Sequence, residues 1–155
     1  MNPSNSKELP STRYYEACSR ALWDSDLIAS RLTLFLAEIL WALMLIWPGD
    51  TFGRPTYNLM SVVATEGTWA VLFLISATLQ MYIILSENFR SAFAHCFAGW
   101  NAMLWVFVVV SMLGSVYPPP AAIGGEISLA VLAVWIFIRP YFLTMMYGRA
   151  YARTV

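Results

Sequence analysis

Ionisable and amide side chains interrupt the apolar runs of this sequence, and they are the residues whose chemistry needs an explanation. A charged group at membrane depth costs about 2.5–3.5 kcal/mol on insertion scales, so each one needs a partner or a purpose. Counting at about 1.5 Å per residue, we expect most of them at similar depths near one side of a membrane, with Asn101 deeper. Together they form a predicted intramembrane polar layer: Glu38, Gln80, His95, Asn101 and Arg139.

This polar layer has three interpretations. A structural layer would pair Glu38 with Arg139 or His95 and would hydrogen-bond Gln80 across helices. A proton- or ion-handling site would use Glu38 or His95 as the group that changes charge, in a transport or channel path. The third interpretation is a ligand pocket or a surface for a partner.

Three further carboxylates lie near the ends of the apolar runs, on the side opposite to most of the basic residues: Asp50, Glu66 and Glu126. A carboxylate at a helix N-terminus is stabilised by the helix dipole and by free backbone N–H groups. We expect this helix-end role for Glu66 and Glu126. An acidic vestibule for a cation, with Arg54 as the only nearby basic residue, is the alternative.

The residues needed for other site chemistry are missing. Nucleophilic catalysis needs a Ser or Cys beside a histidine base, but Cys96 follows His95, the only histidine, and would point about 100° away on a helix. No spacing predicts a metal site, and no glycine loop predicts a phosphate site. We therefore expect neither an enzyme nor a cofactor, with a lipid or quinone pocket among Trp100, Trp105 and Trp135 as a lower alternative.

The apolar runs themselves predict an all-α membrane protein. Of the 155 residues, 59% are hydrophobic and 12% charged, against about 25% charged in a soluble domain. A span needs about 20 mainly apolar residues. We predict four spans joined by short connections, hence an up-down-up-down four-helix bundle within residues 31–147. The spans are about 32–47, 67–85, 91–113 and 121–139, the last with an alternative end at 147 beyond Arg139-Pro140.

Residues 1–30 and 148–155 are predicted to lie outside the membrane. Residues 11–31 have aromatic and apolar side chains at helical spacing. They predict either an amphipathic helix on the inner leaflet or a solvated leader. Asp24-Ser25-Asp26 is expected to begin a fresh helix that leads into the first span.

Basic residues predict the orientation of the spans. Eight of the nine Lys and Arg residues flank one side, and Arg54 alone flanks the other. Lys and Arg are enriched in cytoplasmic loops. We therefore expect both termini in the cytoplasm, with a bacterial inner membrane as the best match.

Small residues recur along one stripe of the third span: Ala94, Ala98 and Ala102, with Gly99 beside them. Such a stripe lets another helix backbone approach closely. It predicts either packing within the bundle or contact with another protein, and His95 at its border is expected to point into protein.

The function predicted from these features is non-enzymatic: association with a second copy or with another membrane protein in the bilayer. Four-span proteins of this size include accessory proteins of phages and plasmids, colicin-immunity-like proteins, small transporters and subunits of larger complexes, although architecture alone does not decide among them. The alternative is a small channel or proton-coupled transporter that uses Glu38 and His95. The net charge is zero, which gives no attraction to nucleic acid.

Overall fold

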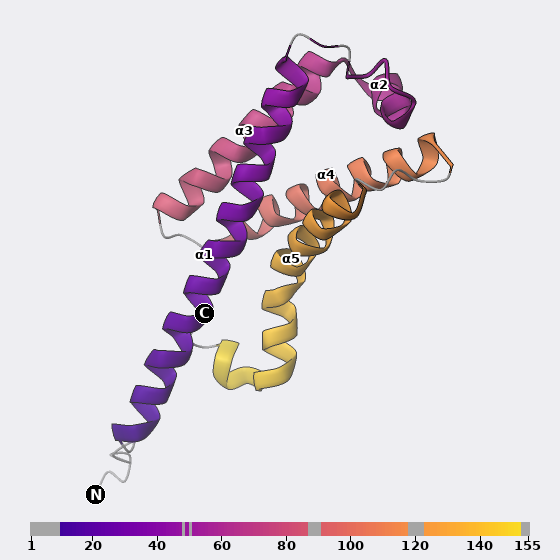
Figure 1. Ribbon diagram of the computed structural model, residues 1–155. Coiled ribbons are helices and arrows are strands. Elements are labelled where there is room, and N and C mark those ends of the chain that lie inside the picture. The colour runs from indigo at the N-terminus through magenta and orange to yellow at the C-terminus, as the bar shows by residue number, and fades with distance from the viewer. Residues whose placement is uncertain (1–9, 48, 50, 87–90, 118–122, 153–155) are drawn as a thin grey trace, which may run out of the picture.

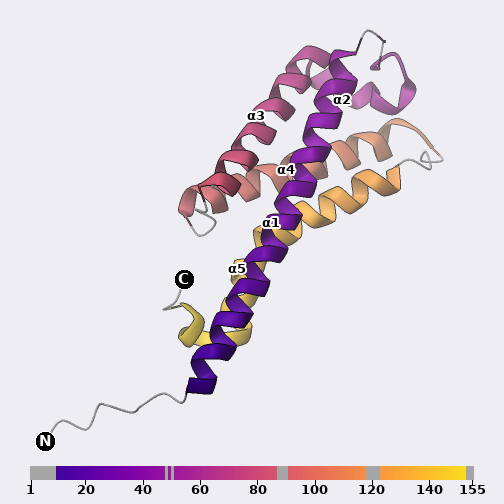
Figure 2. The ribbon, with the colours of Figure 1, turned by 60° about the vertical axis from the view of Figure 1, so that its left-hand side comes forward.

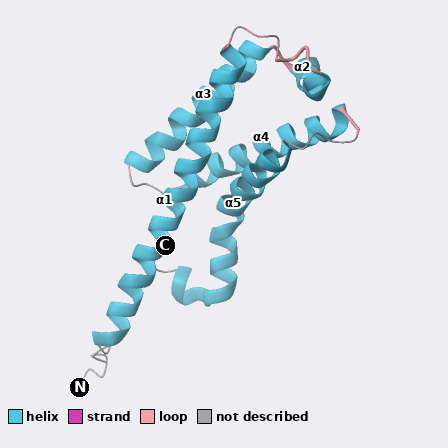
Figure 3. Ribbon diagram, in the orientation of Figure 1, coloured by secondary structure: helices cyan, strands magenta, loops and turns pink. Residues whose placement is uncertain are grey.

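The fold consists of helices in all the parts of the chain that the structure describes. The structure is a computed structural model that describes residues 10–47, 49, 51–86, 91–117 and 123–152, with side chains from Ser25 to Phe142 and at Met145 within these ranges. Figure 3 shows helices joined by loops, with no strand in these ranges. The helices are α1 Pro10–Ile46, η1 Pro55–Tyr57, α2 Asn58–Val63, α3 Glu66–Leu85, α4 Ala92–Ser115 and α5 Ile123–Ala152.

Four of these helices are long and apolar enough to cross a membrane. The candidate spans are Ser25–Ile46, Glu66–Leu85, Ala92–Ser115 and Ile123–Phe142. By length and composition the chain is therefore a membrane protein with four candidate spans, as the sequence predicted. The order of the helices across the bilayer, up-down-up-down, stays a prediction.

The four long helices form two antiparallel pairs. Helix α1 lies along α3, and α4 lies along α5, whereas contact between α3 and α4 is slight. Figures 1 and 2 show the α4–α5 pair crossing the α1–α3 pair at an angle. We expected every pair of consecutive helices to pack as neighbours, but α3 and α4 diverge after their short connection.

Helix α1 is continuous from the N-terminal segment into the first span. The prediction that a fresh helix begins at Asp24-Ser25-Asp26 is wrong, because α1 runs without a break from Pro10 to Ile46. Asp and Ser cost well under 1 kcal/mol each inside a helix, so a helix that already exists on both sides passes through them. Figure 1 shows the N-terminal part continuing the line of the span beyond the other helices, and its position on the inner leaflet stays a prediction.

Side-chain hydroxyl groups cap the N-terminal ends of two of the span helices. The Thr65 hydroxyl accepts a hydrogen bond from the Thr68 N–H at 3.3 Å, and the Ser91 hydroxyl accepts one from the Ala94 N–H at 3.0 Å. Each satisfies one of the free N–H groups in the first turn of a helix. Thr65 and Ser91 therefore fix where α3 and α4 begin.

Helix α5 continues past Arg139 to Ala152, so Arg139-Pro140 does not end the helix, while the end of the fourth span in the membrane stays a prediction. Pro140 lies inside this helix, and the candidate span ends two residues later, at Phe142. Proline removes one backbone donor but does not always end a helix. Figure 1 shows α5 changing direction along its C-terminal half.

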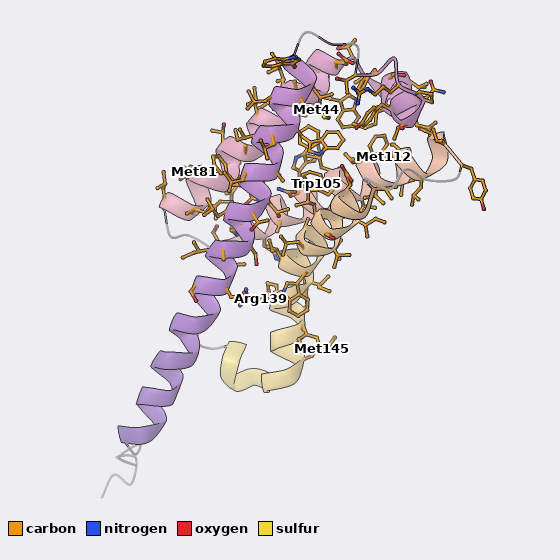
Figure 4. The ribbon with its side chains drawn as sticks, in the orientation of Figure 1. Met44, Met81, Trp105, Met112, Arg139 and Met145 are labelled. Carbon is orange, nitrogen blue, oxygen red and sulfur yellow. The ribbon has the colours of Figure 1, made fainter. Side chains whose placement is uncertain are left out.

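The core lies where the two pairs cross, and α4 is the most enclosed helix. Half of its span residues are buried, against 28% in the first and fourth spans. Trp105 of α4 is fully buried there, on the side of the α1–α3 pair that faces α4 and α5 (Figure 4). Its ring centroid lies 6.0 Å from that of Trp41 of α1 and 5.6 Å from that of Phe73 of α3. The aromatic rings therefore tie the two helix pairs together.

Candidate functional site

The most unusual group in the core is the carboxyl of Glu38. Helix α1 buries a stripe with helical spacing, Arg31, Leu34, Glu38, Trp41, Ala42 and Leu45, and Glu38 within it is 0% exposed. Glu38 lies close to the middle of the span Ser25–Ile46. The sequence prediction placed it nearer the cytoplasmic end because it took the span to begin at 32.

Asn101 of α4 is the hydrogen-bond partner of Glu38. The Asn101 Nδ2 donates to Glu38 Oε1 at 2.5 Å, and Asn101 is 1% exposed. The predicted pairing of Glu38 with Arg139 or His95 is wrong: among the described residues, Asn101 alone has a side chain hydrogen-bonded to this carboxyl. An amide supplies a donor without a second charge, so the contact leaves the carboxyl without a counter-charge.

Two more donor groups face the same carboxyl, and the sequence interpretation missed both in this role. The Ser76 hydroxyl from α3 and the Trp105 indole N–H from α4 lie within interaction range of Glu38. Both side chains are 0% exposed. Ser76 precedes Gln80 by one helical turn, which was the signal available in the sequence. The carboxyl from α1 is thus surrounded by neutral donors from α3 and α4.

This group, which we call the Glu38 cluster, comprises Glu38, Ser76, Asn101 and Trp105. It contains four of the six buried side-chain atoms that lack a hydrogen-bond partner in the described part of the chain: Glu38 Oε2, Ser76 Oγ, Asn101 Oδ1 and Trp105 Nε1. Such atoms are rare in native proteins. With exposures of 0–1%, the cluster has no space for a ligand the size of water. It is a closed contact between helices and not an open path.

Arg31 forms a second polar contact, closer to the C-terminal end of α3. Its Nη1 donates to Gln80 Oε1 at 2.8 Å, and its Nη2 donates to the Ala94 carbonyl oxygen at 3.4 Å. The side chain is 2% exposed and lies inside the span Ser25–Ile46. We had expected Arg31 only as a flanking charge, because a lone Arg does not show from sequence which helices will cover it.

His95 and Arg139 each contact a different partner. His95 Nε2 lies 3.0 Å from the Tyr141 hydroxyl, and its ring stacks on Phe137 of α5 at 5.0 Å. Arg139 is 5% exposed and lies 3.8 Å from the carboxylate of Asp26; Figure 4 shows it between α5 and α1. The predicted layer is therefore divided into separate contacts that join α1 to α3, α4 and α5, and α4 to α5.

The small-residue stripe is used inside the molecule. Ala94, Ala98 and Ala102 are 0%, 3% and 7% exposed. A Cβ atom at Gly99 would lie 3.0 Å from the Phe137 ring. Of the two predicted uses of the stripe, the geometry corresponds to packing within the bundle.

The three tryptophans of the predicted lipid or quinone pocket do not share one cavity. Trp105 belongs to the closed core, while Trp100 and Trp135 are 41% and 37% exposed. Trp135 instead lines an apolar groove of about 360 Å³, which we call the α4–α5 groove. Its lining residues are Val106, Val109, Ile127, Ala130, Val131, Val134, Trp135 and Ile138.

Two of the predicted outer carboxylates, Glu66 and Glu126, lie in the first turns of α3 and α5. The Glu66 carboxylate accepts a hydrogen bond from the Phe52 N–H. Burial raises the pKa of Tyr57, and the negative charge of Glu126 raises it further while Arg54 opposes the shift. Glu126 therefore lies near Tyr57, the last residue of η1. Asp50, the third predicted carboxylate, lies outside the described residues.

No metal-binding group is apparent in the described ranges: three or more His, Cys, Asp or Glu side chains do not come together there. No protein-family model, no curated protein and no solved structure matches the chain. The residues and contacts above are therefore the whole basis for assigning a function.

Proposed function

We propose that this protein is a non-enzymatic membrane protein that acts by association in the bilayer, with a second copy or with another membrane protein. The observation that carries the proposal is the α4–α5 groove, which is lined only by apolar side chains and opens outward. Val131, in its lining, is 64% exposed. An apolar helix face fits such a groove, as helix association in membranes depends on close van der Waals packing.

The polar contacts support the same proposal. The side chains of Arg31, Glu38, Gln80 and Asn101 are turned inward and buried. The described spans thus leave mainly apolar side chains for interactions at the surface. A surface of this kind can bind a partner by apolar packing, and it exposes few groups that could catalyse a reaction.

Cross-linking in native membranes, followed by native mass spectrometry from a mild detergent, tests the proposal. We expect wild-type complexes above the monomer mass, and fewer of them in Val131→Phe, which fills the α4–α5 groove. The matched control is Val71→Phe on α3, at a position that is 54% exposed and outside that groove. A monomer without partners in wild type, or equal loss in both variants, would contradict the proposal.

For the location, we propose a bacterial inner membrane with both termini in the cytoplasm. The support is the distribution of basic residues, because Arg54 is the only one of nine on the opposite side. Positive residues in short loops determine the orientation of spans during insertion.

The Glu38 cluster supports a second candidate, proton-coupled transport. An ionisable residue inside a membrane is a functional candidate by default, and Glu38 has neutral donors around it instead of a cation. Because the cluster is closed, transport would require the two helix pairs to separate. Proton-driven flux into liposomes should then be lost in Glu38→Gln and kept in Thr78→Val, a control at an exposed position of α3. Unchanged flux in Glu38→Gln and in His95→Ala would remove this candidate.

A further inference from the structure

A second groove lies at the end of α1 opposite the N-terminus, away from the α4–α5 groove. We call it the α1-end groove. Its volume is about 370 Å³, and both the last turns of α1 and the loop after them line it. The lining residues are Leu40, Leu43, Met44, Trp47, Gly49, Thr51 and Arg54.

Hydrogen bonds hold the loop in place over the end of α1. The Thr51 hydroxyl lies 3.4 Å from the carbonyl oxygens of both Met44 and Gly49 and donates its one proton to either of them, and Thr51 is 8% exposed. The Phe52 N–H donates to the Glu66 carboxylate of α3. The carbonyl of Met44 is one of those that a helix end leaves free. These hydrogen bonds join the loop to α1 on one side and to α3 on the other, and they define the shape of the groove.

The groove combines exposed apolar side chains, a tryptophan and a cation. Leu40 and Leu43 are 65% and 54% exposed, and Trp47 follows at the end of the helix with 74%. Leu40 lies about 10 Å deeper along the helix axis than Trp47. Tryptophan is enriched where the hydrocarbon core meets the headgroups. Arg54, from the loop after α1, lines the same groove and is exposed.

Arg54 is an exposed cation without a carboxylate partner among the described residues. Glu66, the nearest described acid along the chain, accepts a hydrogen bond from the Phe52 N–H. A guanidinium offers several N–H donors in a planar fork that matches phosphate oxygens. Gly49 adds open space, because nothing lies within 4 Å of a Cβ atom built there.

We propose that the α1-end groove binds an anionic phospholipid from the adjacent leaflet. One acyl chain lies on Leu40, Leu43 and Met44, and the phosphate is bound by Arg54 beside Trp47. The groove offers apolar surface for an acyl chain, a tryptophan for the interface and a guanidinium for a phosphate. Because Leu40 and Leu43 are exposed, the groove is open toward the surrounding lipid, and a lipid can enter it from the side.

Photo-cross-linking tests this site in the intact protein. The probe is phosphatidylglycerol with a diazirine in one acyl chain, in nanodiscs of phosphatidylcholine, and mass spectrometry locates the adducts. We expect adducts on the peptide that contains Leu40 and Trp47. Their yield should fall about fivefold in Arg54→Gln, the loss expected for one basic residue near a membrane surface.

The matched control is Arg20→Gln, which removes the same charge from the N-terminal segment and should leave the yield on that peptide unchanged. Leu43→Trp, which fills the apolar half of the groove, should lower the yield with all charges kept. Excess unlabelled phosphatidylglycerol should compete, whereas phosphatidylcholine should not. Equal yield in Arg54→Gln, equal competition by the two lipids, competition by inorganic phosphate alone, or adducts spread equally over α3 at Val71 would each overturn the proposal.

Discussion

Glu38 is a buried carboxyl within a candidate span, and its surroundings are polar but uncharged. Asn101 bonds it directly, and Ser76 and Trp105 face it from α3 and α4. A buried polar group is expensive when its partner is removed, because the remaining group then loses its hydrogen bond without regaining water. The Glu38 cluster should therefore contribute to the stability of contact between the helix pairs.

Asn101→Leu tests this contribution. The substitution keeps the volume and removes the amide, so we expect the free energy of unfolding to fall by about 1–3 kcal/mol. Unfolding of the purified protein in mixed detergent, followed by circular dichroism, measures it. Thr78→Val is the control: the Thr78 hydroxyl is exposed and bonds only to the Leu74 carbonyl of its own helix. An Asn101→Leu protein as stable as Thr78→Val would show that the cluster contributes nothing.

The hydrogen bond between Arg31 and Gln80 leads to a separate prediction. Gln80→Leu should cost about 1–3 kcal/mol, because it leaves the buried guanidinium with the Ala94 carbonyl alone. The double variant with Arg31→Leu should cost less than the sum of the two single variants, since it removes both partners. A double-mutant cycle of unfolding free energies measures the coupling, and strict additivity would argue against the pair.

At the scale of elements, α4 is the most enclosed of the span helices, and the sequence indicated this in part. The spacing of Ala94, Ala98 and Ala102 predicted a face that another helix approaches closely, and these residues are buried. Which helix approaches was not predictable, because small residues carry no partner-specific chemistry. Gly99 shows the answer at one point: its missing side chain leaves room for Phe137 of α5.

Gly99→Leu tests the α4–α5 contact. A Cβ atom there already lies 3.0 Å from Phe137, so a larger side chain must push α5 away and should cost about 1–3 kcal/mol. Gly125→Ala is the control, since nothing lies within 4 Å of its Cβ position and alanine gains about 1 kcal/mol of helix propensity. Thermal unfolding in detergent measures both. Similar midpoints for the two variants would contradict the packing.

The ends of the elements were predicted less well than their existence. The spans followed from runs of apolar residues, and Thr65 and Ser91 begin α3 and α4 close to where those runs begin. Asp24-Ser25-Asp26 resembled a helix start but lies inside α1. Such residues mark a helix start only where the preceding residues are not helical. The three residues alone do not show the conformation of those before them.

For the whole molecule, four apolar helices were predictable, but their pairing was not. Depth along a helix can be counted from sequence, and this placed Glu38 and Gln80 inside the spans. The choice of Asn101 for Glu38, and of Arg31 for Gln80, depends on how the α1–α3 pair crosses the α4–α5 pair, which is a tertiary property. The outer surface, with the α4–α5 groove, is where we propose that a partner binds.

The central claim is that the chain crosses the bilayer four times with both termini in the cytoplasm, and single-cysteine labelling tests it most directly. In a protein with Cys18→Ser and Cys96→Ser, one of three exposed positions is replaced in turn: Asn58→Cys, Ser86→Cys or Tyr117→Cys. A membrane-impermeant maleimide applied to spheroplasts should label Asn58→Cys and Tyr117→Cys. It should label Ser86→Cys only after the membrane is opened. Labelling of Ser86→Cys from outside, or of Asn58→Cys and Tyr117→Cys on opposite sides, would contradict the account.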